Sequence, residues 1–500
     1  MPRIIVLGLL VLIGACTSLE PVELPPEYTA PPADAPLWSS LEQARPEGWI
    51  VPLNDGPTAL EWRLRAIDSA TESIDLQTFL WTFDTAGSMV LDRLLAAAER
   101  GVVVRLLVDD TYLLGEDDVL VALDAHPRIE FRVFNPYANR SRESASRMLA
   151  NLNELDRLDH RMHNKSLVVD GRVSIVGGRN LADEYFGTHE LANFRDLEAL
   201  LAGPAVRAVS GSFDDYWNSP WSVPVAMLSD STGSPLALEE IRSRWDRGLG
   251  LYTVEPESER AERWRTLVAS APDGEITFFA DNPPEKNPAN PESAPVQVAN
   301  ALITLLDGAR EEIVIISAYL IPTSDLTSAV ARAVDRGVQV RMLTNSVRSN
   351  NHLAAHGAYR RHIAGLVADG VAVHEVRADA RDRQRYMISP VATKLLGLHA
   401  KALLIDHEYA FIGSANMDPR SLRLNTEMGV LVSGREFNAE IRSVIDPDFN
   451  PANAWKLQPN GQGGVIWVSA RETRTTQPSS SFLQELEDWF FSLLPIEEEL

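Results

Sequence analysis

The chain has 500 residues, of which 45% are hydrophobic and 23% are charged, and its formal net charge is -24. This length exceeds what one ordinary core needs, so it predicts a globular protein of two or more domains. Because affinity for a phosphate backbone comes mainly from clustered Lys and Arg, the acidic balance disfavours nucleic acid as a partner.

The N-terminus has the pattern of a secretory signal. Arg3 precedes an apolar run over residues 4–13, which is too short to span a bilayer as a helix, and small residues then lead to Cys16. The sequence IGAC resembles the lipobox of bacterial lipoproteins, in which the signal is cut before a cysteine that is then acylated. We therefore expect a signal peptide over residues 1–15 and a lipid anchor on Cys16. An ordinary signal followed by a stray cysteine is the alternative.

The expected lipid anchor predicts the cellular location of the protein. Cys16 is the only cysteine of the chain, and several acyl chains on it would hold an acidic protein durably at a membrane. Thr17 in place of aspartate resembles lipoproteins that are sorted to the outer membrane. We expect a lipid-anchored protein of the cell envelope that faces the periplasm, with the outer membrane favoured over the inner one.

The segment after the cysteine is rich in proline and acidic residues, as in EPVELPPEYTAPPADAPL. This composition predicts an extended tether over residues 16–50.

The body of the chain is written twice. RGVVVRLL begins at Arg100 and RGVQVRML begins at Arg336, which are 236 positions apart, and His163 and His399 are separated by the same offset. Two features at one offset indicate an internal duplication. Each half alternates amphipathic helices with apolar strands, so each predicts an α/β unit with a mixed, largely buried sheet. The expected helices and strands are 60–70, 73–80, 89–101 and 102–110 in the first half, and 298–309, 312–320, 326–337 and 338–346 in the second.

The expected domains are residues 51–250 and 251–455, followed by a C-terminal tail over 456–500. The prolines of DNPPEKNPANPESAP, residues 281–295, make a regular element there improbable. In the tail, Phe482, Leu486, Phe490 and Leu493 have helical spacing and predict an apolar stripe. Because this helix is acidic, we expect it to dock on the protein body and not on a membrane.

The motif His-x-Lys-x4-Asp occurs in both halves, as HNKSLVVDG and as HAKALLIDH. His163 and Lys165 are two residues apart on a predicted strand, so their side chains share a face. Lysine supplies a point charge for phosphoryl oxygens, and histidine supplies a nucleophile or a general acid. One His-x-Lys alone is usually a surface pair. Because a second copy occurs at His399 and Lys401, a catalytic role is the better interpretation.

Polar residues follow each motif at matching positions, and we expect them to bind a phosphoryl group. Asparagine amides can donate to phosphoryl oxygens, and the serine hydroxyl would be an extra donor in the second half only. Two facing copies suit a two-step displacement, in which one imidazole attacks phosphorus and the other moves protons. No metal or cofactor is required, because lysines and asparagines stabilise the charge. The candidates are Gly177 and Asn180 in the first half, and Gly413, Ser414 and Asn416 in the second.

HNKSLVVDGRVSIVGGRN and HAKALLIDHEYAFIGSANMDPRSLRLNTE closely resemble the paired HKD motifs of the phospholipase D superfamily. GGRNLADEYFG, the LTNS stretch, HGAY and SANMDPRSLRLNTEMG are similar to bacterial cardiolipin synthases, those of type C above all. The resemblance implies two duplicated phospholipase D-like α/β/α sandwich domains, with mixed sheets packed face to face around one shared active site.

The resemblance also implies roles for individual residues. His163 would be the nucleophile that carries a phosphohistidine, and His399 would be the acid and base. Asp196 and Glu427 would orient the imidazoles, although the 33 residues from His163 to Asp196 exceed the 28 from His399 to Glu427. Many relatives have serine where this chain has Gly178. The motif aspartates Asp170 and Asp406 would be structural and hold the turn.

Other polar residues have competing interpretations. His352 and His356 have the i, i+4 spacing of zinc helices, but no glutamate or third ligand accompanies them. We expect instead that His356 and Tyr359 line the substrate cleft. Arg179 and Arg420 are candidates to contact phosphate, with a salt bridge in the loop as an equal alternative.

The sequence thus predicts an enzyme that transfers a phosphatidyl group to a lipid alcohol such as phosphatidylglycerol. Expected partners are phospholipids, namely phosphatidylglycerol and, as a further candidate, phosphatidylethanolamine, together with the membrane itself through the anchor. A phospholipase D hydrolase that uses water is the first alternative. A nuclease of the same superfamily and a lipoprotein with a relic site follow it.

Overall fold

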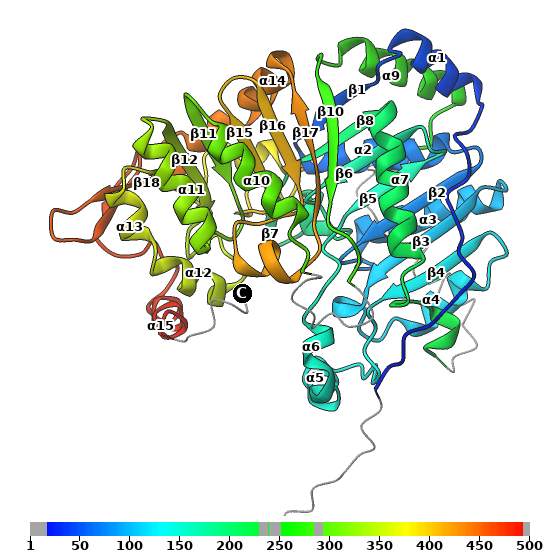
Figure 1. Cartoon of the computed structure of the whole chain (residues 1–500), viewed down its shortest axis with the longest axis horizontal. Helices are drawn as coiled ribbons and strands as arrows, with labels where there is room; N and C mark the ends of the chain where they lie inside the picture. The colour runs from blue at the N-terminus through cyan, green and yellow to red at the C-terminus, as the bar shows by residue number, and fades with distance from the viewer. Residues whose placement is uncertain (1–17, 230–238, 240–251, 285–293, 494–500) are drawn as a thin grey trace, which may run out of the picture.

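A computed structural model of the chain describes residues 18–229, 239, 252–284 and 294–493 as two sheets flanked by helices (Figure 1). The first sheet runs in the order β1-β8-β6-β5-β2-β3-β4-β9, and the second begins β10-β17-β16-β15-β11-β12-β13-β18. The two orders correspond strand by strand. The expected duplication of one α/β unit is therefore present in the fold.

The strands of the first sheet are short and mostly buried. They are β1 (Trp49–Leu53), β2 (Ser73–Thr78), β3 (Val103–Asp109), β4 (Ile129–Phe134), β5 (Ser166–Val169), β6 (Val173–Gly177), β8 (Glu198–Ala202) and β9 (Ser222–Pro224). Strands β2, β3 and β4 are parallel to one another, and the remaining pairs are antiparallel. The helices of this half are α1 (Pro36–Ala44), α2 (Gly56–Ser69), α3 (Thr85–Glu99), α4 (Asp117–Asp124), α5 (Ser144–Ala150), α6 (Leu155–Leu158), α7 (Pro204–Trp217) and α9 (Glu257–Ser270).

The second sheet repeats this plan and extends it. Its strands are β10 (Glu275–Ala280), β11 (Glu312–Ile316), β12 (Gln339–Asn345), β13 (Ala372–Val376), β15 (Ala402–Ile405), β16 (Tyr409–Gly413), β17 (Met428–Ser433), β18 (Ala454–Pro459), β19 (Val465–Val468) and β20 (Thr473–Arg474). Its helices are α10 (Gln297–Gly308), α11 (Ser324–Asp335), α12 (Leu353–Arg360), α13 (Ile363–Ala368), α14 (Arg435–Ile445) and α15 (Phe482–Phe491). The sheet thus continues past residue 455, where we expected a separate tail to begin.

The two sheets pack face to face through one shared apolar core. Val176 of β6 and Leu201 of β8 belong to the same buried cluster as Ile412 of β16 and Val430 of β17. A short parallel pair, β7 (Ala192–Arg195) and β14 (Leu395–Leu398), also joins the halves. Because both halves complete one core, they form one structural unit, as the resemblance implies.

Helix α9 lies beyond the expected boundary at residue 250 but packs on the first half. Trp264 of α9 is fully buried, and its ring lies 5.4 Å from that of Trp38, 6.1 Å from that of Trp49 and 5.0 Å from that of Trp62. This aromatic packing fixes α9 to the first half, although its place in the sequence put it in the expected second domain.

The proline-rich segment is extended, but it is not a free tether. The Val22 amide donates to the carbonyl of Pro220, the Thr29 amide donates to Asp214, and Trp38 is buried in the first core. Proline-rich composition predicts an extended backbone, and it carries no information about the polar groups that this backbone meets. The expected tether is therefore corrected to a docked strap over residues 18–45.

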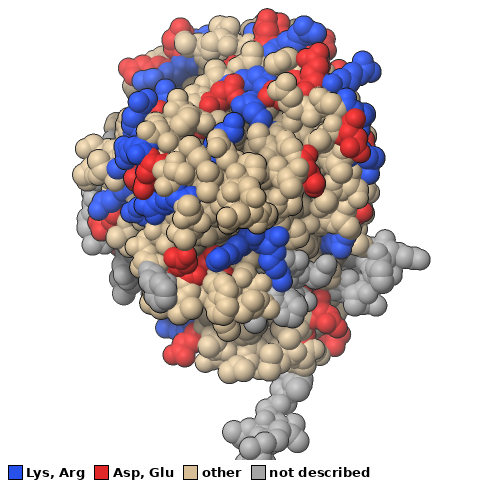
Figure 2. Space-filling model, turned by 90° about the vertical axis from the view of Figure 1, so that its left-hand side faces the viewer, with Lys and Arg blue, Asp and Glu red and all other residues tan. Residues whose placement is uncertain are grey.

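The C-terminal helix docks on the protein, as expected, and lies on α12 (Figure 1). Its apolar stripe does not make this contact: Leu486 and Phe490 are exposed, while Asp488 is buried. Figure 2 shows acidic and basic side chains intermingled on the face formed by the second half. Among the helices of the described segments, none combines the length and hydropathy needed to cross a bilayer. Residues 1–17 and 285–293, on which some expectations rest, lie outside the described residues.

Candidate active site

His163 of the first half is held by the second half. Its backbone amide donates to the carbonyl of Thr426, and its Nδ1 lies 2.9 Å from both carboxylate oxygens of Glu427. Strand β5 begins only at Ser166, so His163 and Lys165 lie just before the strand and not within it. The side chain of Glu427 is fully buried, and this contact fixes the orientation of the ring.

His399 of the second half is held by the first half in the same way. Its backbone amide donates to the carbonyl of Arg195, and its Nδ1 lies 2.6 Å from the carboxylate of Asp196. The two carboxylates that the resemblance implied are thus crossed between the halves. When each Nδ1 is protonated and donates to its carboxylate, the Nε2 of the neutral ring keeps a lone pair.

The two lysines act on both imidazoles. Burial, Lys165 and Lys401 lower the pKa of His163 well below its ordinary value. Burial, with Lys401 ahead of Lys165, lowers the pKa of His399 to about 3. Both histidines are therefore neutral in the empty site, which is the form that a nucleophile needs. Because Glu427 of the second half holds His163 and Asp196 of the first half holds His399, the halves form one site.

The lysines are themselves shifted. Burial lowers the pKa of Lys165 to about 7 and that of Lys401 to about 8. Each Nζ also donates to the carbonyl of the histidine two residues earlier, 2.6 Å away for Lys165 and 2.5 Å for Lys401. Two buried cations at one site are costly, so the site favours an anionic ligand such as a phosphodiester.

The two carboxylates differ. Burial raises the pKa of Glu427 to about 7, although Lys165 and Ser414 oppose the shift. Burial would also raise the pKa of Asp196, but His399 and Lys401 hold it below its ordinary range. Asp196 is therefore ionised at neutral pH, while Glu427 titrates there.

Asn180 and Asn416 are both buried, and the side-chain oxygen of each lacks a hydrogen-bond partner within the described chain. The two amides occupy matching places in the halves. Their unpartnered oxygens can only accept hydrogen bonds, so the amide nitrogens are the donors available for phosphoryl oxygens. Ser414 does not fit the expected role of a phosphate donor: its hydroxyl donates to Glu427 and accepts from the amide of Met428. A hydroxyl has one proton, so Ser414 positions the carboxylate instead.

The glycines have structural places. A Cβ on Gly177 would lie 2.6 Å from the Cα of Glu198 on β8, and one on Gly413 would lie 2.5 Å from the carbonyl of Met428 on β17. Both glycines therefore permit close approach of neighbouring strands, and their expected contact with substrate stays a prediction. A Cβ on Gly178 would overlap with the carboxylate of Asp196.

Asp170 and Asp406 shape the hairpin turns of the two motifs. Their φ values are +54° and +53°, in the left-handed region. Asp170 accepts from the backbone amides of residues 71–73, and Asp406 accepts from those of residues 310–312. Asp170 thus caps the start of β2 and Asp406 caps the start of β11, the strands beside their own hairpins. This is the structural role that we expected.

His356 and Tyr359 do not line the cleft. His356 is buried, with Nδ1 2.5 Å from Asp488 of α15, and the Tyr359 hydroxyl donates to the buried Glu375. The expectation failed because their partners are too far along the sequence to be recognised. Arg179 is also structural: its guanidinium is buried and donates to several backbone carbonyls, including that of Asp196. Arg420 pairs with Asp159 across the halves, 2.8 Å apart.

Aromatic rings flank both histidines and were missed in the sequence. The ring of Phe79 lies 5.0 Å from that of His163, and the rings of Tyr185 and Phe194 lie 4.9 Å and 5.4 Å from that of His399. Phe79 follows β2 directly, and Phe194 lies in β7 two residues before Asp196. The positions of Phe79 and Phe194 at strand ends were the signal in the sequence by which they could have been found.

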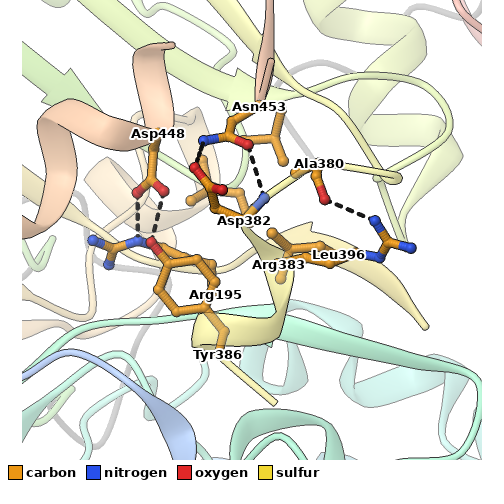
Figure 3. Close-up of a pocket in the computed structure, with 10 residues that line it drawn as sticks. Arg195, Ala380, Asp382, Arg383, Tyr386, Leu396, Asp448 and Asn453 are labelled. Atoms are coloured by element: carbon orange, nitrogen blue, oxygen red, sulfur yellow. Dashed lines mark hydrogen bonds and ion pairs between the residues drawn. The ribbon is translucent and has the colours of Figure 1, made fainter. Parts of the chain in front are cut away.

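A small pocket lined by Arg195 of the first half and by residues of the second half, among them Leu398, lies where the halves meet (Figure 3). Arg195 reaches across to Asp448, with Nε 2.8 Å from the carboxylate, and Tyr386 donates to the same carboxylate at 2.7 Å. Arg195 also donates to the carbonyl of Asp196. We call Arg195, Tyr386 and Asp448 the clasp, because these residues join the halves at Arg195, the residue before Asp196.

Two copies of one α/β fold, with paired His-x-Lys segments that meet across their interface, define the class: an enzyme of the phospholipase D superfamily. Among the described residues, no group of three or more His, Cys, Asp or Glu side chains is arranged to hold a metal ion.

Comparison with known proteins specifies the family. A family model described as "Cardiolipin synthase, PLD-like domain" matches residues 64–214 and 302–448. The chain is 33% identical to cardiolipin synthase C of Escherichia coli (strain K12), over 90% of this chain and 95% of that protein. It is 31% identical to an uncharacterized protein of Helicobacter pylori (strain ATCC 700392 / 26695), over 87% of both chains. The chain therefore belongs to the cardiolipin synthase family of phospholipase D-like proteins.

A solved structure supports the fold. The crystal structure of phosphatidylserine synthase from Haemophilus influenzae Rd KW20 is similar with a TM-score of 0.53 and 14% sequence identity, covering 84% of this chain and 91% of that one.

Proposed function

We propose that this enzyme is a membrane-anchored phosphatidyltransferase that makes cardiolipin by way of a phosphohistidine. The observation that carries the proposal is the crossed arrangement, in which Glu427 holds His163 and Asp196 holds His399. It leaves two Nε2 atoms for one phosphodiester, one to attack and one to move protons.

In the first step, Nε2 of His163 attacks phosphorus and a P–N bond forms. The P–O bond to the leaving alcohol breaks, and His399 gives that alcohol its proton. In the second step, His399 takes the proton of an incoming lipid alcohol, whose oxygen displaces Nε2 of His163. With phosphatidylglycerol as both donor and acceptor, the products are cardiolipin and glycerol, and both histidines return to their starting state.

The carboxylates support this division of labour. His399 must carry a positive charge before it protonates the leaving group, and the ionised Asp196 stabilises an imidazolium. A bound phosphodiester also offsets the lysine charges that lower the pKa of both histidines. Lys165, Lys401 and the amides of Asn180 and Asn416 would stabilise the charge on the phosphoryl oxygens.

The location belongs to the same proposal. We infer that Cys16 is acylated after cleavage of residues 1–15 and that the enzyme faces the periplasm, with the outer membrane favoured. Growth with a labelled fatty acid tests this step: label should enter the wild-type chain and be absent from Cys16→Ser.

The experiment for the reaction uses the purified enzyme with phosphatidylglycerol, with and without phosphatidylethanolamine, and separates the lipid products. We expect cardiolipin from the wild type and none from His163→Ala or His399→Ala. Phosphatidic acid without cardiolipin would identify a hydrolase and overturn the transferase proposal. DNA degradation that is lost in His163→Ala would identify a nuclease.

A further inference from the structure

We propose that the molecule rests on the lipid surface through two exposed apolar patches, and that this contact turns the catalytic cleft toward the phospholipid headgroups. The patches are Met148, Leu149 and Leu152 beside α5, and Leu486, Trp489 and Phe490 on α15. We call the six residues the apolar rim. The inference rests on the proposed function, because it concerns how a lipid substrate reaches the site.

Helix α15 is attached to α12 by a face that carries the polar side chains of Gln484 and Asp488 together with Phe491, whose Cβ lies beside Gly357. Asp488 is fully buried against His356 and Arg360 of α12, and the Gln484 amide group donates to the carbonyl of Val347 at 2.9 Å. The opposite face carries the apolar side chains, of which Leu486 is 45%, Trp489 48% and Phe490 54% exposed. A helix in contact only with water and protein normally has the reverse arrangement. The inversion indicates an apolar neighbour outside the described residues of the chain.

The segment around α5 is inverted in the same way. Met148 is 60%, Leu149 69% and Leu152 51% exposed. Between them, Arg147 and Asn151 are buried: Arg147 donates to the carbonyls of Asp110 and Leu113, and Asn151 donates to that of Asn139. The polar residues thus fix this segment and the apolar residues face outward.

Both patches lie at the edge of the molecule that carries the chemistry. Helices α5 and α6 lie in the segment between the end of β4 and His163, and α6 ends at Leu158, five residues before this histidine. Helix α12, on which α15 lies, follows the end of β12 in the second half, and His352 at its start packs 5.8 Å from the ring of Tyr319. Figure 1 shows α5, α6 and α15 at the lower edge of the molecule, below both sheets.

The anchor fixes which surface covers the rim. The Leu19 amide donates to Glu154 at 2.9 Å, so the start of the described chain is bound beside Leu152. Cys16 is three residues upstream, and three extended residues span at most about 10 Å. An acyl group on Cys16 must therefore enter a bilayer next to the α5 patch. Since the chain is acidic, with a net charge of -24, apolar insertion and not charge attraction holds the rim there.

The test measures the depth of single positions in the membrane, on the full lipid-anchored chain carrying His163→Ala so that no turnover is needed. Leu149→Cys and Leu486→Cys each receive an NBD fluorophore in vesicles of phosphatidylethanolamine and phosphatidylglycerol that contain doxyl-labelled lipid. We expect quenching at both positions. The parent chain, treated alike, reports any labelling of Cys16.

Val103→Cys is the matched control. Val103 is 44% exposed and begins β3, whose other end, Asp109, accepts from the amide of Met162 beside His163. It therefore lies at the opposite edge of the sheet and should stay unquenched. Quenching at residues 149 and 486 that is no stronger than at residue 103 overturns the inference. If the rim is quenched but the active enzyme transfers no phosphatidyl group, the proposed function fails and the inference about the rim stands.

A second measurement asks whether the rim serves catalysis. The triple variant Leu486→Ser, Trp489→Ser, Phe490→Ser should turn over vesicle phospholipid at least about tenfold more slowly, because three side chains lose their transfer into lipid. Its rate on a soluble short-chain phosphodiester should be unchanged, and Val103→Ser should not affect either rate. Equal loss on both substrates, or loss on neither, contradicts the proposal.

Discussion

At the scale of single residues, the crossed histidine–carboxylate pairs are the feature from which the rest follows. Glu427 is 264 positions from His163, and Asp196 is 203 positions from His399. Each half therefore supplies the imidazole of one pair and the carboxylate of the other. Because each imidazole depends on the opposite half for its orientation, neither half alone can form a competent pair.

Asp196→Asn tests the crossing. The amide keeps the shape of the carboxylate but removes the charge that stabilises a protonated His399. We expect kcat to fall by about a hundredfold or more with little change in KM, since proton transfer contributes about this much. Steady-state kinetics on phosphatidylglycerol vesicles measure it, and an unchanged kcat would show that Asp196 does not act through His399.

Gly178 offers a second residue-level prediction. Gly178→Ser introduces the residue that the second half has at the matching position, Ser414, but its Cβ would overlap with the carboxylate of Asp196. We expect kcat to fall by about tenfold or more, because small misplacements of catalytic groups are costly. Gly211→Ser on α7 is the control, since no atom of a neighbouring described residue lies within 4 Å of the place that its Cβ would take. Equal activity of both variants would contradict the proposed packing.

The pH dependence follows from the shifted groups. Glu427, with a pKa of about 7, must be ionised to hold His163, so activity should fall as the pH drops below neutrality. Lys165 and Lys401, with pKa values of about 7 and 8, lose their charges as the pH rises through these values. We expect a bell-shaped profile of kcat/KM centred near neutral pH, whose apparent pKa values belong to the coupled groups. A plateau that extends well above pH about 9 would show that the lysine charges are not needed.

At the scale of elements, the parallel pair of β7 and β14 places Asp196 and His399 next to each other. Strand β7 ends at Arg195 and β14 ends at Leu398, so each strand is followed at once by a residue of the pair. The clasp of Arg195, Tyr386 and Asp448 secures this junction through Arg195, the last residue of β7 (Figure 3).

Asp448→Ala tests the clasp. It leaves the buried guanidinium of Arg195 without its ion pair, which should lower the free energy of unfolding by about 3 kcal/mol. We also expect a lower kcat, partly recovered in Asp448→Asn, because the clasp positions Asp196. Chemical denaturation and kinetics measure the two effects. Asp307→Ala, which breaks the exposed pair with Arg332, is the control and should change little.

The sequence predicted some elements well because their signals are local. Alternating helices and apolar strands, repeated at one offset, were sufficient for the duplicated fold and for His163, Lys165, His399 and Lys401. Ser414 and His356 were misplaced, because their partners Glu427 and Asp488 are identified only by packing. The prediction of a free tether at residues 18–45 failed for the same reason. The hydrogen bonds of this segment to Asp214 and Pro220 leave no pattern in the sequence.

At the scale of the whole molecule, the two sheets bury one common core and enclose one candidate site at their shared edge. The start of the described chain is bound to Glu154 close to α5, and both α5 and α15 lie at the lower edge of the molecule (Figure 1). An anchored enzyme with this arrangement would meet its lipid substrates without extracting them from the membrane. The duplication thus supplies both the paired chemistry and the two flanks of the proposed lipid-contact surface.

The central claim is that one phosphatidyl group rests on His163 between two half-reactions. Rapid quenching of the enzyme with phosphatidylglycerol labelled in its acyl chains, followed by denaturation at neutral to alkaline pH and peptide mass spectrometry, tests it most directly. The account predicts a phosphatidyl adduct on the peptide that contains His163, absent from His163→Ala. An adduct on the His399 peptide, or turnover to cardiolipin with full activity in His163→Ala, would contradict it.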